Sequence, residues 1–200
     1  MGLYKIINAD NKSCHGGSFD WTPYLPTKNE DGSWTPGQWT PTVDVEMCKS
    51  GYHIVDAKYI LNWIDAQCYE VEYIGIVQSD DNDKYAAESI QLIKKMEEWN
   101  DKNLRLFACW CVRQVWNLLE DERSKKAIEV SEQFANGQAT QDELAAAWDA
   151  SQAAAMDSAR AAAWAAAWAA ARDSAWAAAR DSARAAQSDK LIEMMKLEQS

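Results

Sequence analysis

The chain has 200 residues, of which 48% are hydrophobic and 11 are tryptophan, and this is enough apolar material for a folded core. Its formal net charge of -11 is unevenly distributed, because residues 1–101 carry 17 acidic side chains against 8 lysines and no arginine. A nucleic-acid-binding protein needs a basic surface, so we expect no nucleic-acid partner.

Two further features of the composition bear on membranes and compartment. The longest uncharged apolar run, from Ala161 to Ala171, has eleven residues and is too short to span a bilayer, so we expect no membrane partner. The five cysteines are an odd number, and the first residues MGLYKIINADNK lack the pattern of a signal peptide. We therefore expect reduced thiols and a cytoplasmic location.

Residues 1–101 predict a small α+β domain with a mostly antiparallel sheet. We expect strands at 3–7, 43–48, 51–55 and 69–77, and a helix at 57–66 that Asp56 caps. Residues 84–96 fit both strand and helix spacing, and we favour a strand that runs into a short helix. Residues 18–42 hold all four prolines and three tryptophans, which predicts a loop that covers the sheet or lines a ligand groove.

Residues 102–200 predict an all-α domain with helices at about 104–119, 122–135 and 140–187 and a short tail helix after Ser188. Asn136-Gly137 is a signal for the end of the second helix, and Thr140 with Glu143 forms a capping box before the third. The expected fold class is α+β, with a small sheet domain followed by a helical domain that contains one long Ala/Trp-rich helix.

An eight-residue unit recurs five times from Ala145 to Arg184 without glycine or proline, and this predicts a continuous helix. Its large side chains fall at every fourth residue and wind round the helix, because four residues advance about 400°. They pack against Trp110, Trp116 and Phe134 of the same chain, or they form a binding surface. Tryptophan and arginine dominate binding hot spots. For the second alternative, the expected contacts with a protein partner or a second copy of the chain come from Arg160, Trp164, Trp168, Arg172, Trp176 and Arg180.

Two stretches carry a resemblance to known families. Leu104 to Ser151, with the alanine-rich repeat that follows, resembles an immunity-protein-like helical domain found in bacterial and phage open reading frames. Residues 48–57 and 80–93 resemble a phage-associated domain of unknown function with a "GFH" strand and a "DK" turn, which Gly51-Tyr52-His53 and Asp83-Lys84 match. The resemblance implies binding of a protein or of a small signal molecule.

Two sets of residues are candidates for chemistry. His53 with Tyr52 and Glu72 is a weak acid–base set of the kind a transferase would use. Cys14, His15, Cys48 and His53 have the donor types that zinc accepts, but they lack a CxxC pair, so we expect no metal and no cofactor.

The sequence favours a non-enzymatic cytoplasmic binding protein of the inhibitor, immunity or anti-defence type. The alternatives are a transferase-like enzyme around His53 and a protein that sequesters a small ligand.

Overall fold

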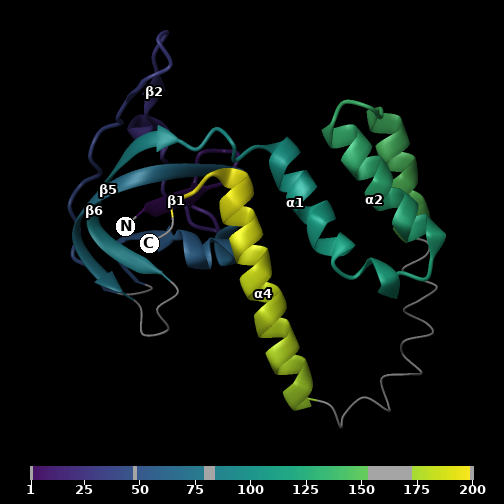
Figure 1. Cartoon of the computed structure of the whole chain (residues 1–200). Helices are drawn as coiled ribbons and strands as arrows, with labels where there is room; N and C mark the ends of the chain where they lie inside the picture. The colour runs from purple at the N-terminus through teal and green to yellow at the C-terminus, as the bar shows by residue number, and fades with distance from the viewer. Residues whose placement is uncertain (1, 47–48, 79–83, 153–172, 199–200) are drawn as a thin grey trace. The chain divides into compact units, whose positions relative to one another are not determined.

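The computed structural model describes residues 2–46, 49–78, 84–152 and 173–198 (Figure 1). They fall into two compact units, one formed by Met1–Asn100 with Ser188–Ser200 and the other by Asp101–Gln187. The first unit contains an antiparallel β-barrel and the second is helical, so the chain is of the α+β class.

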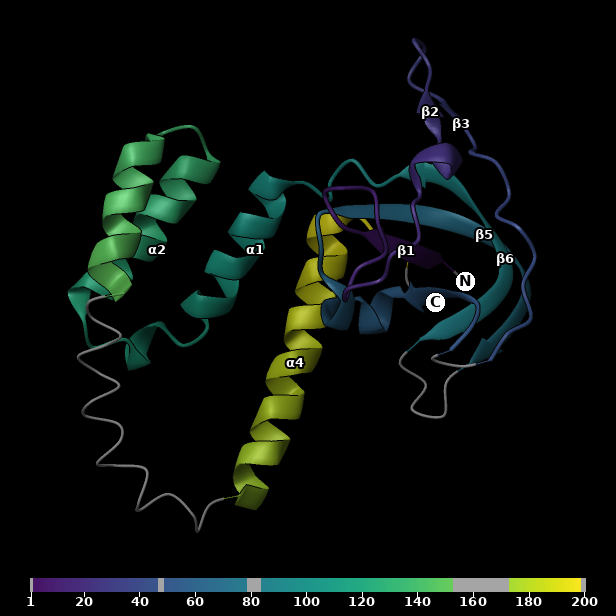
Figure 2. The same ribbon diagram turned by 180° about the vertical axis from the view of Figure 1, so that it is seen from behind.

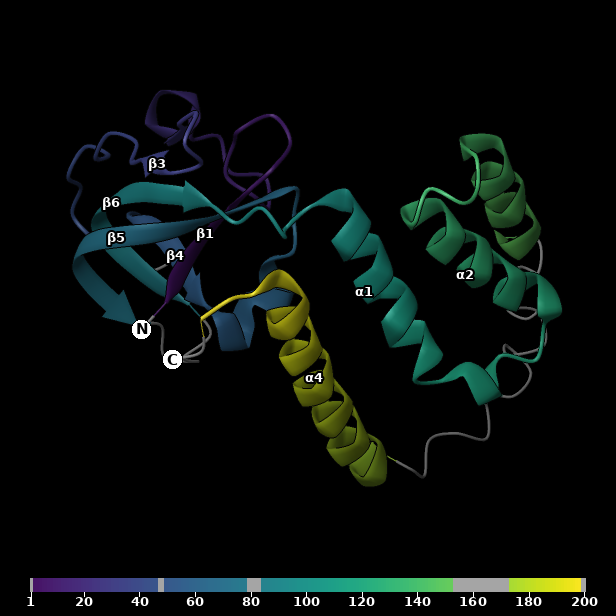
Figure 3. The same cartoon turned by 45° about the horizontal axis from the view of Figure 1, so that its top comes forward.

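Four strands close the barrel in the order β1-β4-β6-β5, and Figure 3 shows them curving round a common axis. They are β1 (Leu3–Ile7), β4 (Tyr52–Asp56), β5 (Gln67–Gln78) and β6 (Tyr85–Lys95). Tyr4 of β1 lies opposite both Val55 of β4 and Glu70 of β5. The register of β5 against β6 shifts between Glu70 and Val71, where the pairing with β1 ends. Such a bulge increases the local twist of the strand pair.

The barrel encloses a core of apolar side chains from all four strands and from the proline-rich loop. Trp21 of that loop is fully buried, and its Nε1 donates a hydrogen bond to Ser13 Oγ at 3.0 Å. The core consists of Leu3, Ile7, Trp21, Tyr52, Ile54, Tyr69, Val71, Ala87, Ile90 and Leu92.

The proline-rich loop also covers part of β6. It contains the short 3-10 helix η1 (Thr22–Tyr24) and a hairpin of β2 (Thr27–Lys28) and β3 (Trp34–Thr35), which stands away from the barrel in Figure 2. The backbone nitrogens of Gly37, Thr40 and Val43 then donate to the carbonyls of Leu92, Ile90 and Glu88 at 2.9, 2.9 and 3.0 Å. Residues 37–43 thus satisfy backbone groups of β6.

Two local expectations for this unit were wrong, and a third is confirmed except for its length. β6 remains a strand as far as Lys95, with no helical end, because it pairs with β5 along its length. Residues 43–45 form no strand, and residues 47–48 lie outside the described part of the chain. The helix expected over 57–66 is present as the 3-10 helix η2 (Ala57–Trp63), which ends three residues early, and Asp56 caps it as predicted by accepting from Tyr59 N at 3.1 Å.

The end of the chain packs on the barrel unit. Helix α4 (Asp173–Met195) contributes Leu191 and Met195, which are fully buried. Ser188 Oγ donates to Lys58 O at 3.2 Å, and Glu198 N donates to Tyr4 Oη at 2.6 Å. Residues 188–200 were expected to belong to the helical domain, but the described part of this segment, residues 188–198, groups with the barrel unit.

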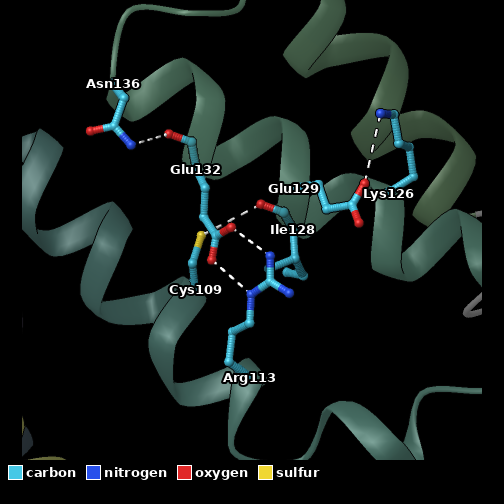
Figure 4. A network of polar contacts seen from close by, with 7 residues as sticks. All are labelled: Cys109, Arg113, Lys126, Ile128, Glu129, Glu132 and Asn136. Atoms are coloured by element: carbon cyan, nitrogen blue, oxygen red, sulfur yellow. Dashed lines mark hydrogen bonds and ion pairs between the residues drawn. The ribbon is translucent and has the colours of Figure 1, made fainter.

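The second unit is built on two packed helices, α1 (Asp101–Arg113) and α2 (Glu122–Ala135). Arg113 Nε and Nη2 donate to the two carboxylate oxygens of Glu132 at 2.9 and 2.6 Å (Figure 4). The helix expected over 104–119 ends at Arg113, and the 3-10 turn η3 (Trp116–Leu118) follows it. The expected limits of α2 are confirmed, and Asp121 caps its start.

Only the two ends of the helix expected over 140–187 lie within the described residues. Residues 141–152 are helical, and the predicted capping box is present, with Thr140 N donating to Glu143 Oε2 at 2.7 Å and Glu143 N to Thr140 Oγ1 at 3.2 Å. Residues 153–172 lie outside the described residues, so the continuous Ala/Trp-rich helix stays a prediction.

Candidate functional site

A small pocket in the barrel unit brings together side chains that are far apart in the sequence. It has room for about one water-sized molecule. Strands β1 and β4, the turn after β1 and helix η2 supply its lining, which consists of Tyr4, Lys5, Ile6, Cys14, His53, Val55 and Trp63.

Lys5 is the most unusual member of this pocket because it lies at the centre of a buried strand. Only 5% of the residue is exposed. Its Nζ donates to His53 O at 2.9 Å and lies 4.9 Å from the centre of the Trp21 ring. Burial lowers the pKa of the Lys5 amine to about 8, because the charged form loses its hydration. A substantial fraction of this amine is therefore neutral near pH 8 and can act as a nucleophile.

Two ring nitrogens of the pocket residues are buried without a hydrogen-bond partner among the described residues. They are His53 Nε2 and Trp63 Nε1. Burial, followed by the charges of Lys5 and Lys84, lowers the pKa of His53, so its imidazole is neutral at pH 7. The indole nitrogen can only donate, and Nε2 of a neutral histidine donates in one of its two tautomers. The pocket therefore offers one donor, Trp63 Nε1–H, and at His53 Nε2 an atom that donates or accepts according to its tautomer.

Cys14 and His15 occupy the turn beside this pocket. Burial raises the pKa of the Cys14 thiol, and the nearby Lys5 amine opposes that shift, so the thiol is protonated at neutral pH. His15 does not line the pocket, and its ring packs edge-on against the Trp63 ring with the centroids 4.9 Å apart. It supports the indole that bounds the pocket.

The structure does not bring the predicted acid–base set together. His53 pairs with Ala86 of β6, whereas Glu72 pairs with Gln91, five residues further along that strand. Five residues of a strand span about 17 Å. Tyr52 neighbours His53 in β4 and therefore points to the other face, where it belongs to the barrel core.

The structure brings together only some of the four residues whose donor types suit zinc, which are Cys14, His15, Cys48 and His53. Cys14 and His53 line one pocket and His15 lies beside it, while Cys48 is outside the described residues. Within the described ranges no group of three or more His, Cys, Asp and Glu side chains is placed to hold a metal ion.

The predicted Trp/Arg surface falls mostly outside the described residues. This applies to Arg160, Trp164, Trp168 and Arg172. Trp176 and Arg180 belong to the helical backbone of α4. Trp148, the first large residue of the repeat, is 47% exposed on the helix formed by residues 141–152.

An exposed apolar strand is the feature that sequence reasoning missed. Tyr73, Ile74 and Ile76 of β5 are 40%, 51% and 38% exposed. β1 pairs with β5 only from Gln67 to Glu70, so in the described chain the rest of β5 has one neighbouring strand, β6. Because successive residues of a strand point to opposite faces, Tyr73 and Ile74 expose apolar groups on both faces. The signal in the sequence is the apolar segment YIGIV, residues 73–77, at the end of the strand expected over 69–77.

Comparison of the chain with protein-family models, curated proteins and solved structures finds no match. Over the described residues, no helix is long and apolar enough to cross a membrane.

Proposed function

We propose that the protein is a non-enzymatic binding protein of the inhibitor or immunity type, and that it holds a partner protein by accepting a strand of that partner at the edge of β5. The observation that carries the proposal is the run of exposed apolar residues Tyr73, Ile74 and Ile76 on a strand with one neighbour in the described chain. Edge strands of this kind are templates for strand addition.

The edge lacks two of the features that commonly protect an exposed strand from pairing. Natural edges carry lysine or proline, or are covered by another segment. Residues 71–76 contain neither lysine nor proline. By contrast, the side of β6 away from β5 is partly covered by residues 37–43. The free edge of β6 is thus partly covered, whereas the free edge of β5 is open, and this difference is consistent with a partner strand that adds to β5.

The charge of the barrel unit indicates what the partner strand carries. Glu70 forms an ion pair with Lys94 at 2.7 Å, while Glu72 is exposed and makes no ion pair with the described residues. Residues 1–101 also hold more than twice as many acidic residues as lysines. A strand of alternating apolar residues with a lysine or arginine opposite Glu72 fits this edge, and the acidic field accelerates its association.

The Trp/Arg row of the alanine-rich helix is a second surface within the same proposal. Trp148 is half-exposed, and an exposed tryptophan supplies a large contact area to a partner or to a second copy of the chain. The two surfaces are separable by substitution because they belong to different units.

The test is affinity capture with the wild type and three single variants as baits, followed by quantitative mass spectrometry. Ile74→Lys places a charge in the proposed interface, and Ile64→Lys places the same charge at a 42%-exposed isoleucine elsewhere in the barrel unit. Trp148→Ala tests the helical surface. We expect a specific protein to be captured by the wild type and by Ile64→Lys, and to be reduced at least tenfold on Ile74→Lys. Equal capture by both lysine variants, or loss only on Trp148→Ala, would contradict strand addition at β5.

A further inference from the structure

We propose that in the free protein the open edge of β5 is covered by β5 of a second copy of the chain, in an antiparallel pair centred on Ile74, and that this weak homodimer opens when the partner strand binds. This pairing rests on the same open edge as the proposed function and concerns what occupies that edge before the partner arrives. Two strands that add to each other across a two-fold axis cover both exposed edges at once.

The exposed part of β5 is centred on Ile74. Residues 72–76 are all exposed, and Ile74 is the middle one and the most exposed of its apolar members. When two copies pair antiparallel about a two-fold axis through Ile74, this residue meets its own copy, and the residues on either side of it meet each other in pairs. The register uses the whole exposed segment and keeps opposite residues on the same face of the sheet.

The charges of β5 fit a second copy in this register. The carboxylate of Glu72 lies opposite Ile76 of the second copy and not opposite another carboxylate. The two Glu72 side chains stand four residue positions apart along the strands, about 13 Å, which exceeds the screening length of about 8 Å in physiological salt. The centre of the pair is therefore apolar, and its like charges do not face each other.

The glycine at position 75 gives the second copy a polar contact. The side chain of Glu88 in β6 lies across Gly75, so closely that a Cβ added at Gly75 would collide with it. In the proposed register Tyr73 of the second copy lies opposite Gly75, on the face that carries Glu88. The Glu88 carboxylate has no hydrogen bond or ion pair with the described residues, so it can accept from this tyrosine hydroxyl. By symmetry the contact forms twice.

The homodimer is weak, and this allows the partner strand to replace it. Only five residues of each copy pair, which is a small contact compared with stable interfaces. Two copies that each carry a net charge of -11 also repel each other. A partner strand with a lysine or arginine opposite Glu72 pairs with a carboxylate that the second copy leaves without a counter-charge. The edge of β5 is thus free in dilute solution and covered in concentrated solution.

The experiment is sedimentation velocity of the full chain over a wide range of concentration, at low and at high sodium chloride. We expect reversible dimerisation that strengthens as salt is added, because salt screens the repulsion between two acidic copies. Ile74→Lys places two ammonium groups opposite each other, and we expect about a hundredfold weaker dimerisation. Ile64→Lys, the matched control at another exposed isoleucine, should leave the dimer unchanged. Tyr73→Phe removes only the hydroxyl and should weaken the dimer about tenfold.

Oxidative cross-linking tests the register. We expect an interchain disulfide in Ile74→Cys, because this position meets its own copy. We expect none in Glu72→Cys, because its two thiols would stand about 13 Å apart. Peptide mapping separates this disulfide from any bond that the five native cysteines form.

Glu72→Lys separates self-pairing from the proposed function. It removes a negative charge from each copy, so we expect the homodimer to persist, while capture of a partner with a basic residue opposite this position falls. Self-pairing is overturned by a chain that stays monomeric at every concentration and salt, by a dimer that Ile74→Lys leaves intact, or by equal cross-linking at positions 72 and 74. Partner capture that still depends on Ile74 would in each of these cases leave strand addition at β5 standing.

Discussion

Replacing Leu191 by alanine tests whether the end of the chain stabilises the barrel. Leu191 lies near the C-terminal end of α4 and is fully buried. In the sequence it stands between Ser188 and Glu198, which donate hydrogen bonds to Lys58 and Tyr4 of the barrel unit. The substitution removes three carbon atoms and leaves a cavity, and substitutions of this kind cost about 3 kcal/mol at fully buried sites. That loss lowers the folding equilibrium constant of the barrel unit roughly a hundredfold.

The assay is amide hydrogen exchange read by mass spectrometry, combined with urea unfolding. We expect exchange in β1 to accelerate in Leu191→Ala, because the C-terminal segment packs with that unit, while exchange in α2 stays the same. Met194→Ala is the matched control, since Met194 is only half-buried on the same helix and should cost less. The reasoning is refuted if α2 loses protection and β1 does not, or if Leu191→Ala unfolds at the same urea concentration as the wild type.

Three further outcomes are expected. Since the folded pKa of Lys5 is lowered from 10.5 to about 8, the folded state binds fewer protons than the unfolded state between these values, and Lys5 destabilises the fold most below pH 8. At pH 7 Lys5→Met should therefore unfold at a higher urea concentration than the wild type, with an unfolding free energy larger by roughly 3 kcal/mol. This difference in unfolding free energy should shrink as the pH rises towards 10. A difference that does not change with pH would contradict the prediction. A double-mutant cycle on Arg113→Ala and Glu132→Ala should give a coupling free energy of about 1 kcal/mol or less, because both side chains are partly exposed to solvent. A much larger coupling free energy would show that solvent screens this ion pair less than the exposure of its side chains indicates. Gly75→Ala should lower the unfolding free energy by about 1–2 kcal/mol, because Gly75 has a φ of +54°, and a neutral effect in thermal unfolding would show that the strand relaxes there.

Local signals predicted much of the fold. The segment LYKII formed β1 at its expected limits, and the capping residues Asp56 and Thr140 located the starts of two helices. These features depend on neighbours in the sequence. Residues 85–95 were ambiguous because short apolar runs satisfy both helical and strand spacing, and pairing with β5 decided the outcome.

The candidate site could be predicted only in part, because its members come from separated segments. Cys14 and His53 were singled out for metal binding, yet the pocket that joins them depends on Lys5 and Trp63, which no spacing rule connects to them. The sequence did contain one signal, namely a lysine at the centre of the strand expected over residues 3–7. The hydrophobic periodicity of residues 188–197 also could not predict that this segment packs on the barrel unit. An amphipathic pattern predicts an apolar face and does not say what covers it.

The most direct test of strand addition is hydrogen exchange of residues 72–76, measured on the free protein and on its complex with the captured partner. Adding a strand gives the exposed backbone amides of β5 new hydrogen-bond acceptors. We predict that these amides exchange at least tenfold more slowly in the complex. Protection confined to the helical unit, with residues 72–76 exchanging at the same rate as in the free protein, would contradict the account.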